Sequence, residues 1–411
     1  MSHNETPQIK RKLTAIVALL AAALIAVTTA GCASARGTSA INERDRQNVA
    51  IAAGKEHSFA IDESGKLYAT GLNEYGELGL GDRQVRHKFV GVPFSGDKRI
   101  IAISTGYVHS LALTSEGKVY SAGHNYAGEL GLGDGKLRDT FTLVPDLSDK
   151  KIVAISAGGS DYSLAVDNNG KVYATGYNRY GQLGLGDKRD RDTFTRVLSL
   201  SDKKIVAIAT GTWHSLALSA DGKVYVAGEN NDGQLGLGDN DDRNTFTLVS
   251  SLSDKKIVTI SAGGKHSFAL DSDGKVYATG DNEYGQLGLG DRKSRETFTL
   301  VPDLSDKKIV AIVAGEWHSL ALSADGKVYA AGRNIEGQLG LGDYDDRKTW
   351  TLVSSTESKP ITTISAYAYH SLALDGNGRL YATGWSGEGE FGLGDEKDRV
   401  VFTPVVLPAK N

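Results

Sequence analysis

The sequence predicts an all-β protein, a seven-bladed β-propeller of four-stranded repeats about 52 residues long. The first observation is a Gly-Lys-Val-Tyr motif that recurs at steps of 52 or 53 residues, with its basic residue at Lys66, Lys118, Lys171, Lys223, Lys275, Lys327 and Arg379. The second is a composition with 50 Gly, 17 Tyr and 1 Met among 411 residues, which is typical of short strands joined by tight turns. So constant a spacing indicates an array in which each unit packs against its neighbours.

The fourth copy illustrates the four strands expected in each unit. Apolar, β-branched runs at 205–209 and 215–218 are read as the first two strands. An Asp221-Gly222 turn leads into a third strand at 223–227, because glycine accepts the positive φ that such turns need. A long loop follows, and a fourth strand is expected at 245–249. The third strand is apolar or small on both faces, as in blades that stack face to face around an axis.

Both ends of the array carry complete units. Residues 49–52 match the first strand of the other copies, and 402–405 match the last. One propeller domain is therefore expected over residues 48–407, with a tail at 408–411, and the ring should close with its two termini side by side.

The amino terminus has the layout of a secretory signal. Three basic residues at 10–12 precede an apolar stretch at 13–27, and the only cysteine, Cys32, follows Ala30-Gly31. This resembles the lipobox of bacterial lipoproteins, which implies a signal peptide at 1–31, lipid on Cys32, a polar tether at 32–47 and an exported, membrane-anchored protein. Two alternatives stay open: cleavage after Ala33-Ser34-Ala35 with free secretion, or retention as a signal anchor.

Charge argues against nucleic acid as a partner. The chain has a formal net charge of −4, and residues 1–31 hold Glu5 and three basic residues, so their removal leaves about −6. No cysteine remains in the propeller for a disulfide, so its stability is expected to come from packing alone.

Several apparent chemical motifs are read as structural. Equivalent histidines recur in six copies, with Tyr162 in the third copy: His57, His109, His214, His266, His318 and His370. Packed sheets lie about 10 Å apart, whereas zinc binds His at about 2 Å, so neighbouring blades should not share a metal. Each His is expected to hydrogen-bond the backbone of its own turn. No metal, cofactor or catalytic residue is predicted.

The remaining motifs are also expected to be structural. In each His-Ser pair the two side chains point to opposite faces of a strand, so Ser215 should not be activated by His214. The Gly-Leu-Gly-Asp loops lack the helix that a phosphate cradle needs. The acidic loops 239–242 and 343–346 lack the spacing of a known calcium loop, and a solvated charged loop is expected, with calcium kept as an alternative.

The repeated string identifies a resemblance. Gly-x-x-His-Ser-Leu-Ala-Leu, Gly-Lys-Val-Tyr and Gly-x-Asn-x-x-Gly-Gln-Leu-Gly-Leu-Gly-Asp together resemble the regulator of chromosome condensation repeat over about residues 48–407. The resemblance implies a seven-bladed propeller whose sequence repeats are offset from its blades, so that one blade takes strands from both termini. It implies little about activity, because the family includes a GTPase exchange factor, a plant ultraviolet receptor and many uncharacterised proteins.

Variation between copies predicts where a ligand binds. In an antiparallel blade the turn after the first strand and the loop after the third lie at the same end, so one rim collects both variable segments. The opposite rim takes the Asp-Gly turns and the Leu-Ser-Asp-Lys-Lys linkers at 147–151, 200–204, 252–256 and 304–308. Ten aromatic residues, a type that anchors interfaces, are predicted to bind ligand at the variable rim: Tyr75, Tyr107, Tyr126, Tyr177, Tyr180, Trp213, Tyr284, Trp317, Tyr369 and Trp385. About half of them are expected to pack onto a neighbouring blade instead.

The function expected from these features is binding rather than catalysis. A monomeric, exported propeller would recognise a protein or a cell-envelope polymer, with inhibition of an enzyme as one subtype. A cell-wall polysaccharide hydrolase or lyase is the first alternative, but catalysis needs unlike residues converging on one point, which near-identical units supply poorly. A guanine nucleotide exchange factor-like regulator is the second, and export argues against it.

Overall fold

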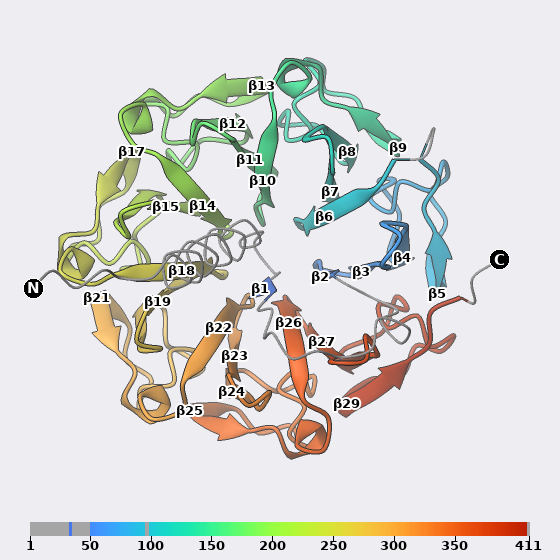
Figure 1. The fold of residues 1–411 in the computed structure, drawn as a ribbon, viewed down its shortest axis with the longest axis vertical. Helices are drawn as coiled ribbons and strands as arrows, with labels where there is room; N and C mark the ends of the chain where they lie inside the picture. Colours follow the sequence, from blue (N-terminus) through green and yellow to red (C-terminus); the bar gives the residue numbers. More distant parts are fainter. Residues whose placement is uncertain (1–32, 35–49, 95–97, 409–411) are drawn as a thin grey trace, which may run out of the picture.

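Seven antiparallel sheets form a closed ring around a central axis in the computed structural model (Figure 1), which describes residues 33–34, 50–94 and 98–408. This architecture confirms the predicted fold class. The predicted signal peptide, Cys32 and nearly all of the tether and tail lie outside the described residues.

Each blade uses four consecutive strands, which run from the axis outward in chain order (Figure 1). The first, innermost strands are β2 (Ala50–Ala53), β6 (Ile100–Thr105), β10 (Ile152–Ala157), β14 (Ile205–Thr210), β18 (Ile257–Ala262), β22 (Ile309–Ala314) and β26 (Ile361–Tyr367). The second strands are β3 (His57–Ile61), β7 (His109–Thr114), β11 (Tyr162–Asp167), β15 (His214–Ser219), β19 (His266–Asp271), β23 (His318–Ser323) and β27 (His370–Asp375). The third strands are β4 (Leu67–Gly71), β8 (Val119–Gly123), β12 (Val172–Gly176), β16 (Val224–Gly228), β20 (Val276–Gly280), β24 (Val328–Gly332) and β28 (Leu380–Gly384). The fourth, outermost strands are β5 (Arg86–Gly91), β9 (Arg138–Leu143), β13 (Arg191–Arg196), β17 (Arg243–Leu248), β21 (Arg295–Leu300), β25 (Arg347–Leu352) and β29 (Arg399–Val405).

The remaining elements are short. The two-residue β1 (Ala33–Ser34) pairs antiparallel with β26. Five 3-10 helices follow outer strands: η1 (Pro145–Leu147), η2 (Leu198–Leu200), η3 (Ser250–Leu252), η4 (Pro302–Leu304) and η5 (Ser354–Thr356). The sequence predicts only linkers at these positions. A buried third residue, such as Leu200 in η2, fixes these helices against the blades.

Burial follows the position of each strand in its blade. In the fourth blade every residue of β15 and β16 is buried, whereas β17 at the perimeter has one buried residue, Phe246, among exposed and half-buried ones. β17 begins at Arg243, two residues before the predicted start, because Arg243 pairs with Gly228 across a register shift. The second and third strands therefore bury both faces, as the sequence predicted, and the outer strand meets water.

Glycines allow loops of one blade to approach the next. Gly340, at φ 70°, has Phe402 of β29 so close that an added Cβ would lie 2.7 Å from the ring. Leu341 beside it forms a bridge with Val401 of the same strand. Each Gly-Leu-Gly-Asp loop thus serves as a clamp on the outer strand of the following blade.

Ring closure uses the same contacts as the other blade boundaries. Leu393 of the last blade bridges Lys88 of the first, and the Gly394 N–H donates to the His87 carbonyl at 2.7 Å. The last sheet takes strands from both ends of the chain, as the resemblance implies, because β1 pairs with β26 there; its four blade strands nevertheless all come from residues 361–405. The chain enters the first blade at the axis and leaves the adjacent last blade at the perimeter, so the two ends lie in neighbouring blades (Figure 1).

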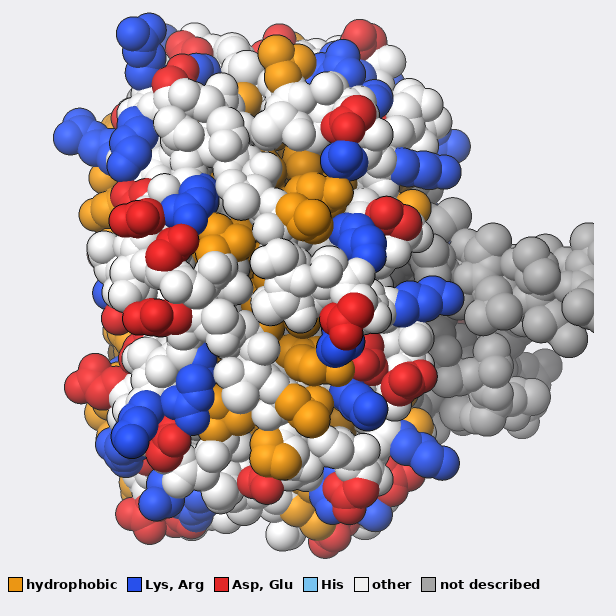
Figure 2. All heavy atoms as spheres, turned by 90° about the vertical axis from the view of Figure 1, so that its left-hand side faces the viewer, with side chains coloured by type: hydrophobic (Ala, Val, Ile, Leu, Met, Phe, Trp, Pro, Cys, Tyr) orange, Lys and Arg blue, Asp and Glu red, His pale blue; other side chains and the backbone are white. Residues whose placement is uncertain are grey.

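The outer wall carries charges of both signs, interspersed with small apolar patches (Figure 2). Leu248 on β17 and Leu300 on β21 are about two-fifths exposed there, at 42% and 41%. No helix within the described ranges is long and apolar enough to cross a membrane.

Candidate ligand-binding rim

The structure brings the two variable segments of each blade to one end of the ring. In the fourth blade the Glu229 N–H donates to the Trp213 carbonyl at 2.9 Å, which ties the loop after β16 to the turn before β15. At the opposite end the Lys223 ammonium bonds the Ser253 carbonyl of the linker. We call the end formed by these turns and loops the variable rim, and the end with the Asp-Gly turns and linkers the linker rim.

A ring of repeated side chains lies directly beneath the variable rim. Each of the six repeated His residues bonds through Nε2 with a Ser hydroxyl of the next blade, at 2.8 to 3.3 Å. The pairs are His57–Ser110, His109–Ser163, His214–Ser267, His266–Ser319, His318–Ser371 and His370–Ser58. Tyr162 takes the place of His in the third blade and donates to the His214 carbonyl at 2.6 Å. The prediction that each His bonds its own turn was wrong, because the ring nitrogen reaches across the blade boundary.

These histidines have a structural and not a catalytic role. Ser267 Oγ donates to the Gln234 carbonyl at 2.8 Å, so the His214 Nε2–H is the donor in the His–Ser bond. Burial lowers the pKa of His214 to about 3, which keeps the imidazole neutral. Ser267 is fully buried and already hydrogen-bonded, so the pair links two blades and does not form a nucleophile with its base.

A second repeated layer holds buried Gln or Glu side chains. Gln182, Gln234, Gln286 and Gln338 occupy this position in four blades, and Glu77, Glu129 and Glu390 occupy it in three. Each side-chain oxygen accepts a backbone N–H two residues earlier, as Glu390 does from Glu388 at 3.1 Å. Burial raises the pKa of Glu390 to about 9 and that of Glu77 to about 7, so these acids resemble the neutral Gln of the other copies.

The ten predicted aromatic residues all lie at the variable rim or close to its axis, and most are partly covered. Tyr126 is 71% exposed, and the other nine are half-buried. None is a fully buried core residue. They divide into three clusters and one residue at the axis.

The largest cluster surrounds Arg333 in the loop after β24. Its guanidinium carbon lies 4.9 Å from the Trp317 ring centre and 5.7 Å from that of Tyr284 in the preceding blade. Tyr369 of the last blade stacks obliquely on Trp317 at 5.5 Å and contacts Trp385 at 5.9 Å. A cation held against aromatic faces makes a rigid surface that presents both charge and apolar area. We call these residues the Arg333 cluster.

Two smaller clusters lie elsewhere on the rim. Tyr180 packs on Tyr177 of its own loop at 6.4 Å and on Trp213 of the next blade at 5.4 Å. Tyr75 and Tyr126 both contact the His124 ring, at 5.1 and 4.4 Å.

Tyr107 has a different role, because it reaches across the axis. Its hydroxyl, from the second blade, donates to Glu316 Oε1 of the sixth blade at 2.7 Å. The Tyr107 ring also packs edge-on against Tyr367 at 5.8 Å, and Tyr367 is buried. Burial raises the pKa of Glu316 although the Tyr107 hydrogen bond opposes this. These side chains cover the centre of the ring at this end, so a ligand of the rim would lie over the loops.

The first aspartate of each acidic loop has its carboxylate engaged by the chain itself. Asp239 Oδ2 accepts from Arg243 at 2.6 Å and Asp343 Oδ2 accepts from Arg347 at 2.5 Å. Their other oxygens, Oδ1, accept backbone N–H groups two residues later. The same Asp–Arg pair occurs in all seven Gly-Leu-Gly-Asp loops, which makes these segments turns closed by an ion pair.

Sequence reasoning missed the polar members of the rim. Arg333, His124 and Glu316 occupy variable positions equivalent to those of the predicted aromatics, but the selection considered aromatic side chains alone. Two of them, His124 and Arg333, directly follow the glycine that ends the third strand. That glycine is required at Gly332 and its equivalents, whereas the next residue varies between copies, and this variation could have identified both. An added Cβ on Gly332, at φ 106°, would lie 2.5 Å from the Trp317 carbonyl oxygen.

Comparison with protein families agrees with the fold. Residues 159–411 match an RCC1-like domain model, and residues 49–77, 100–129, 64–113 and 116–166 match regulator of chromosome condensation (RCC1) repeat models.

Individual relatives agree as well. The ultraviolet-B receptor UVR8 of Arabidopsis thaliana is 37% identical over 309 residues, which are 73% of this chain and 68% of the receptor. The human E3 ubiquitin-protein ligase HERC2 is 32% identical over 79% of this chain, but the match spans 7% of that ligase, so its ligase activity says nothing about this segment. The crystal structure of Prp20p from Saccharomyces cerevisiae superposes with a TM-score of 0.73 at 28% identity, covering 84% of this chain and 87% of Prp20p. This propeller belongs to the RCC1 repeat family.

Proposed function

We propose that this propeller is a protein-binding scaffold that works outside the cytoplasm, tethered by lipid on Cys32, with the variable rim as its binding face. The Arg333 cluster carries the proposal. Its four aromatic rings and one guanidinium come from three successive blades and are half-buried, so they are ordered before any partner arrives. Binding then costs little conformational entropy.

The chemistry of the rim favours a protein over a polysaccharide. Arginine, tyrosine and tryptophan dominate protein–protein hot spots, and a second such surface, Tyr180 with Trp213, lies on the third and fourth blades. Between the two lie Glu229, Asp232 and Asp281, with Lys265 paired to Asp232 at 2.9 Å. A partner with a basic patch flanked by apolar groups would complement this order. Enzyme inhibition is one form such binding would take.

The relatives support binding as the shared role. Prp20p of Saccharomyces cerevisiae binds Gsp1p and histones, and a second crystal structure shows yeast RCC1 bound by Kap60. A GTPase or a histone is a poor candidate here under the proposed export, so we expect a different protein on the same scaffold.

The anchor is tested by Cys32→Ser. In cells fed a radiolabelled or clickable fatty acid, we expect label on the wild-type chain and none on the variant, together with loss of membrane retention. Unlabelled wild-type protein, or equal membrane retention of both forms, contradicts the lipid anchor.

The binding face is tested by capture from envelope extracts. Full-length protein and an Arg333→Ala, Trp317→Ala double variant are crosslinked in parallel, and captured proteins are quantified by mass spectrometry. We expect one or a few envelope proteins to fall at least tenfold in the variant. A glycan array probed with the same pair gives the opposing outcome: rim-dependent binding to a polysaccharide, with no rim-dependent protein, would overturn the assignment.

A further inference from the structure

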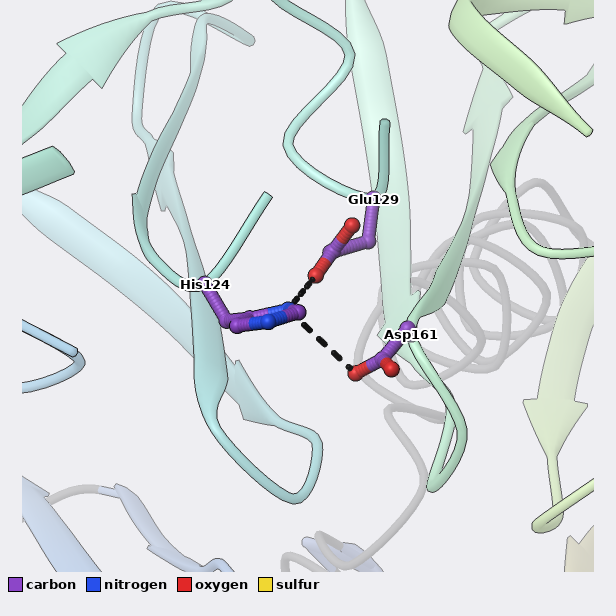
Figure 3. A group of neighbouring side chains, drawn as sticks. All are labelled: His124, Glu129 and Asp161. Atoms are coloured by element: carbon purple, nitrogen blue, oxygen red, sulfur yellow. Dashed lines mark hydrogen bonds and ion pairs between the residues drawn. The ribbon is translucent and has the colours of Figure 1, made fainter. Parts of the chain in front are cut away.

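Three metal-ligating side chains converge between the second and third blades (Figure 3). His124 follows β8, Glu129 lies in the same loop, and Asp161 lies in the turn between β10 and β11. One ligand atom from each falls within 4.8 Å of the other two. His124 Nδ1 bonds Glu129 Oε1 directly and lies 3.8 Å from Asp161 Oδ1.

Two of these residues replace a pair found elsewhere in the ring. In the fourth and fifth blades the buried Gln amide donates to an acid five residues earlier, Gln234 to Glu229 at 3.1 Å and Gln286 to Asp281 at 2.7 Å. In the second blade the buried position holds an acid, Glu129, and the position five residues earlier holds His124. This pairing accounts for His124 and Glu129, and Asp161 adds a second carboxylate 3.8 Å from His124 Nδ1.

Asp161 is the residue that the framework does not require. The third copy has one residue more between its glycine and Tyr162 than the other copies have before their His, and Asp161 occupies a left-handed conformation at φ 50° in that longer turn. No hydrogen bond from a described residue reaches its carboxylate. Burial raises the pKa of Asp161 to about 6, and the nearby Glu129 carboxylate adds to this shift.

We propose that His124, Glu129 and Asp161 bind a divalent transition-metal ion at the variable rim. With the His124 ring neutral, as metal binding through Nδ1 requires, the imidazole and the two carboxylates carry a charge of −2, which a divalent cation balances. The imidazole nitrogen selects zinc, manganese or iron over magnesium and calcium, which prefer oxygen ligands alone. Glu129 is fully buried, whereas the His124 and Asp161 side chains are 14% and 35% exposed, so the site opens toward water on one side. Three protein ligands leave positions free for water or for an acidic group of a ligand.

The test uses the full-length chain after removal of metal with a chelator. Zinc is titrated by calorimetry into the wild type, His124→Gln, Glu129→Gln and Asp161→Asn. Glu129→Gln is the variant least prone to misfolding, because four other copies carry Gln at this position. Glu390→Gln makes the same change in a blade without the His, and His87→Gln removes an exposed His beside Glu396. These two serve as controls.

We expect one zinc ion per wild-type chain, at least tenfold weaker binding in each of the three ligand variants, and unchanged binding in both controls. Affinity should fall from pH 7.5 to pH 5.5, because protons compete for His124 Nδ1. Cobalt bound at this site should lack the intense near-ultraviolet thiolate band that Cys32 would produce. Absence of saturable zinc and manganese binding, equal binding by the ligand variants, or a thiolate band lost in Cys32→Ser would overturn the proposal.

Discussion

Trp213 and His214 are neighbours in sequence, yet they belong to two layers of the molecule that differ in their contacts and in how much their residues vary between copies. His214 points down and bonds Ser267 of the next blade, and its equivalents recur around the ring. Trp213 lies at the rim against Tyr180, and its equivalents include Glu56, Val108, Lys265 and Trp317. The repeated layer joins blades, while the variable layer lies above it and is free to change. Repetition in this chain therefore marks packing, and variation marks the surface available to a partner.

The strongest test of the repeated layer is removal of β2. Deletion of residues 50–53 takes away the inner strand of the first blade and breaks two contacts across blade boundaries, Ala53 N–H to Ser365 Oγ at 3.0 Å and Thr105 Oγ1 to the Ala53 carbonyl at 2.8 Å. We expect the ring to open and cooperative unfolding to be lost. Deletion of residues 35–44, which precede the first blade, is the control. Equal melting temperatures for the two truncations would show that β2 does not hold the ring closed.

The next largest effect concerns Glu390→Gln. The native state keeps this acid protonated up to a pKa of about 9, whereas the unfolded chain releases the proton near 4.5. Because the folded-state pKa is raised, wild-type stability is full below pH 4.5 and falls as the pH rises toward 9. Gln removes this loss, so we expect the variant to be more stable by about 3 kcal/mol at pH 7 and by nearly nothing at pH 4.5.

Denaturant midpoints measured across this pH range check the prediction for Glu390. Glu77→Gln should give nearly the same gain at pH 7, but this gain should stop growing above pH 7, because the pKa of Glu77 is about 7. Glu129→Gln is the internal control, since His124 already bonds that carboxylate and no gain is expected. A stability gain in Glu390→Gln that does not vary with pH would mean that the raised pKa of Glu390 is not its cause.

A smaller effect separates the layers within one turn. Ser267→Ala leaves the buried Nε2–H of His214 without an acceptor, and we expect a loss of about 2 kcal/mol in the free energy of unfolding. Ser160→Ala, in a half-exposed turn of the rim, should change stability by less than about 0.5 kcal/mol. Chemical unfolding of both variants decides the matter. Similar losses of unfolding free energy at both positions would mean that the rim stabilises the fold as much as the repeated layer does.

The sequence was sufficient for the fold because the period and the strand pattern are local properties. It was insufficient for contacts between blades. His214 and Ser267 are 53 residues apart, and their bond appears only when two sheets are stacked in register. Tyr107 and Glu316 meet across the axis, which depends on the diameter of the finished ring. Arg333 is not evident from the sequence for a different reason: an aromatic pattern identifies the rings of the rim but not the cation that packs against them.

The central claim is that partners bind the variable rim, and calorimetric titration of the captured partner against two sets of variants tests it most directly. Trp213→Ala with Trp317→Ala removes one ring from each of two clusters, and we expect binding weaker by about 2 kcal/mol, as for hot-spot truncations, with the fold retained. Lys203→Glu with Lys255→Glu reverses charges at the linker rim, where each ammonium group pairs with the exposed Asp before it and that of Lys203 also lies 6.0 Å from the Tyr225 ring centre, and we expect no measurable change in binding. Weaker binding in the linker variant together with unchanged binding in the tryptophan variant would contradict the account and place the binding face on the linker rim.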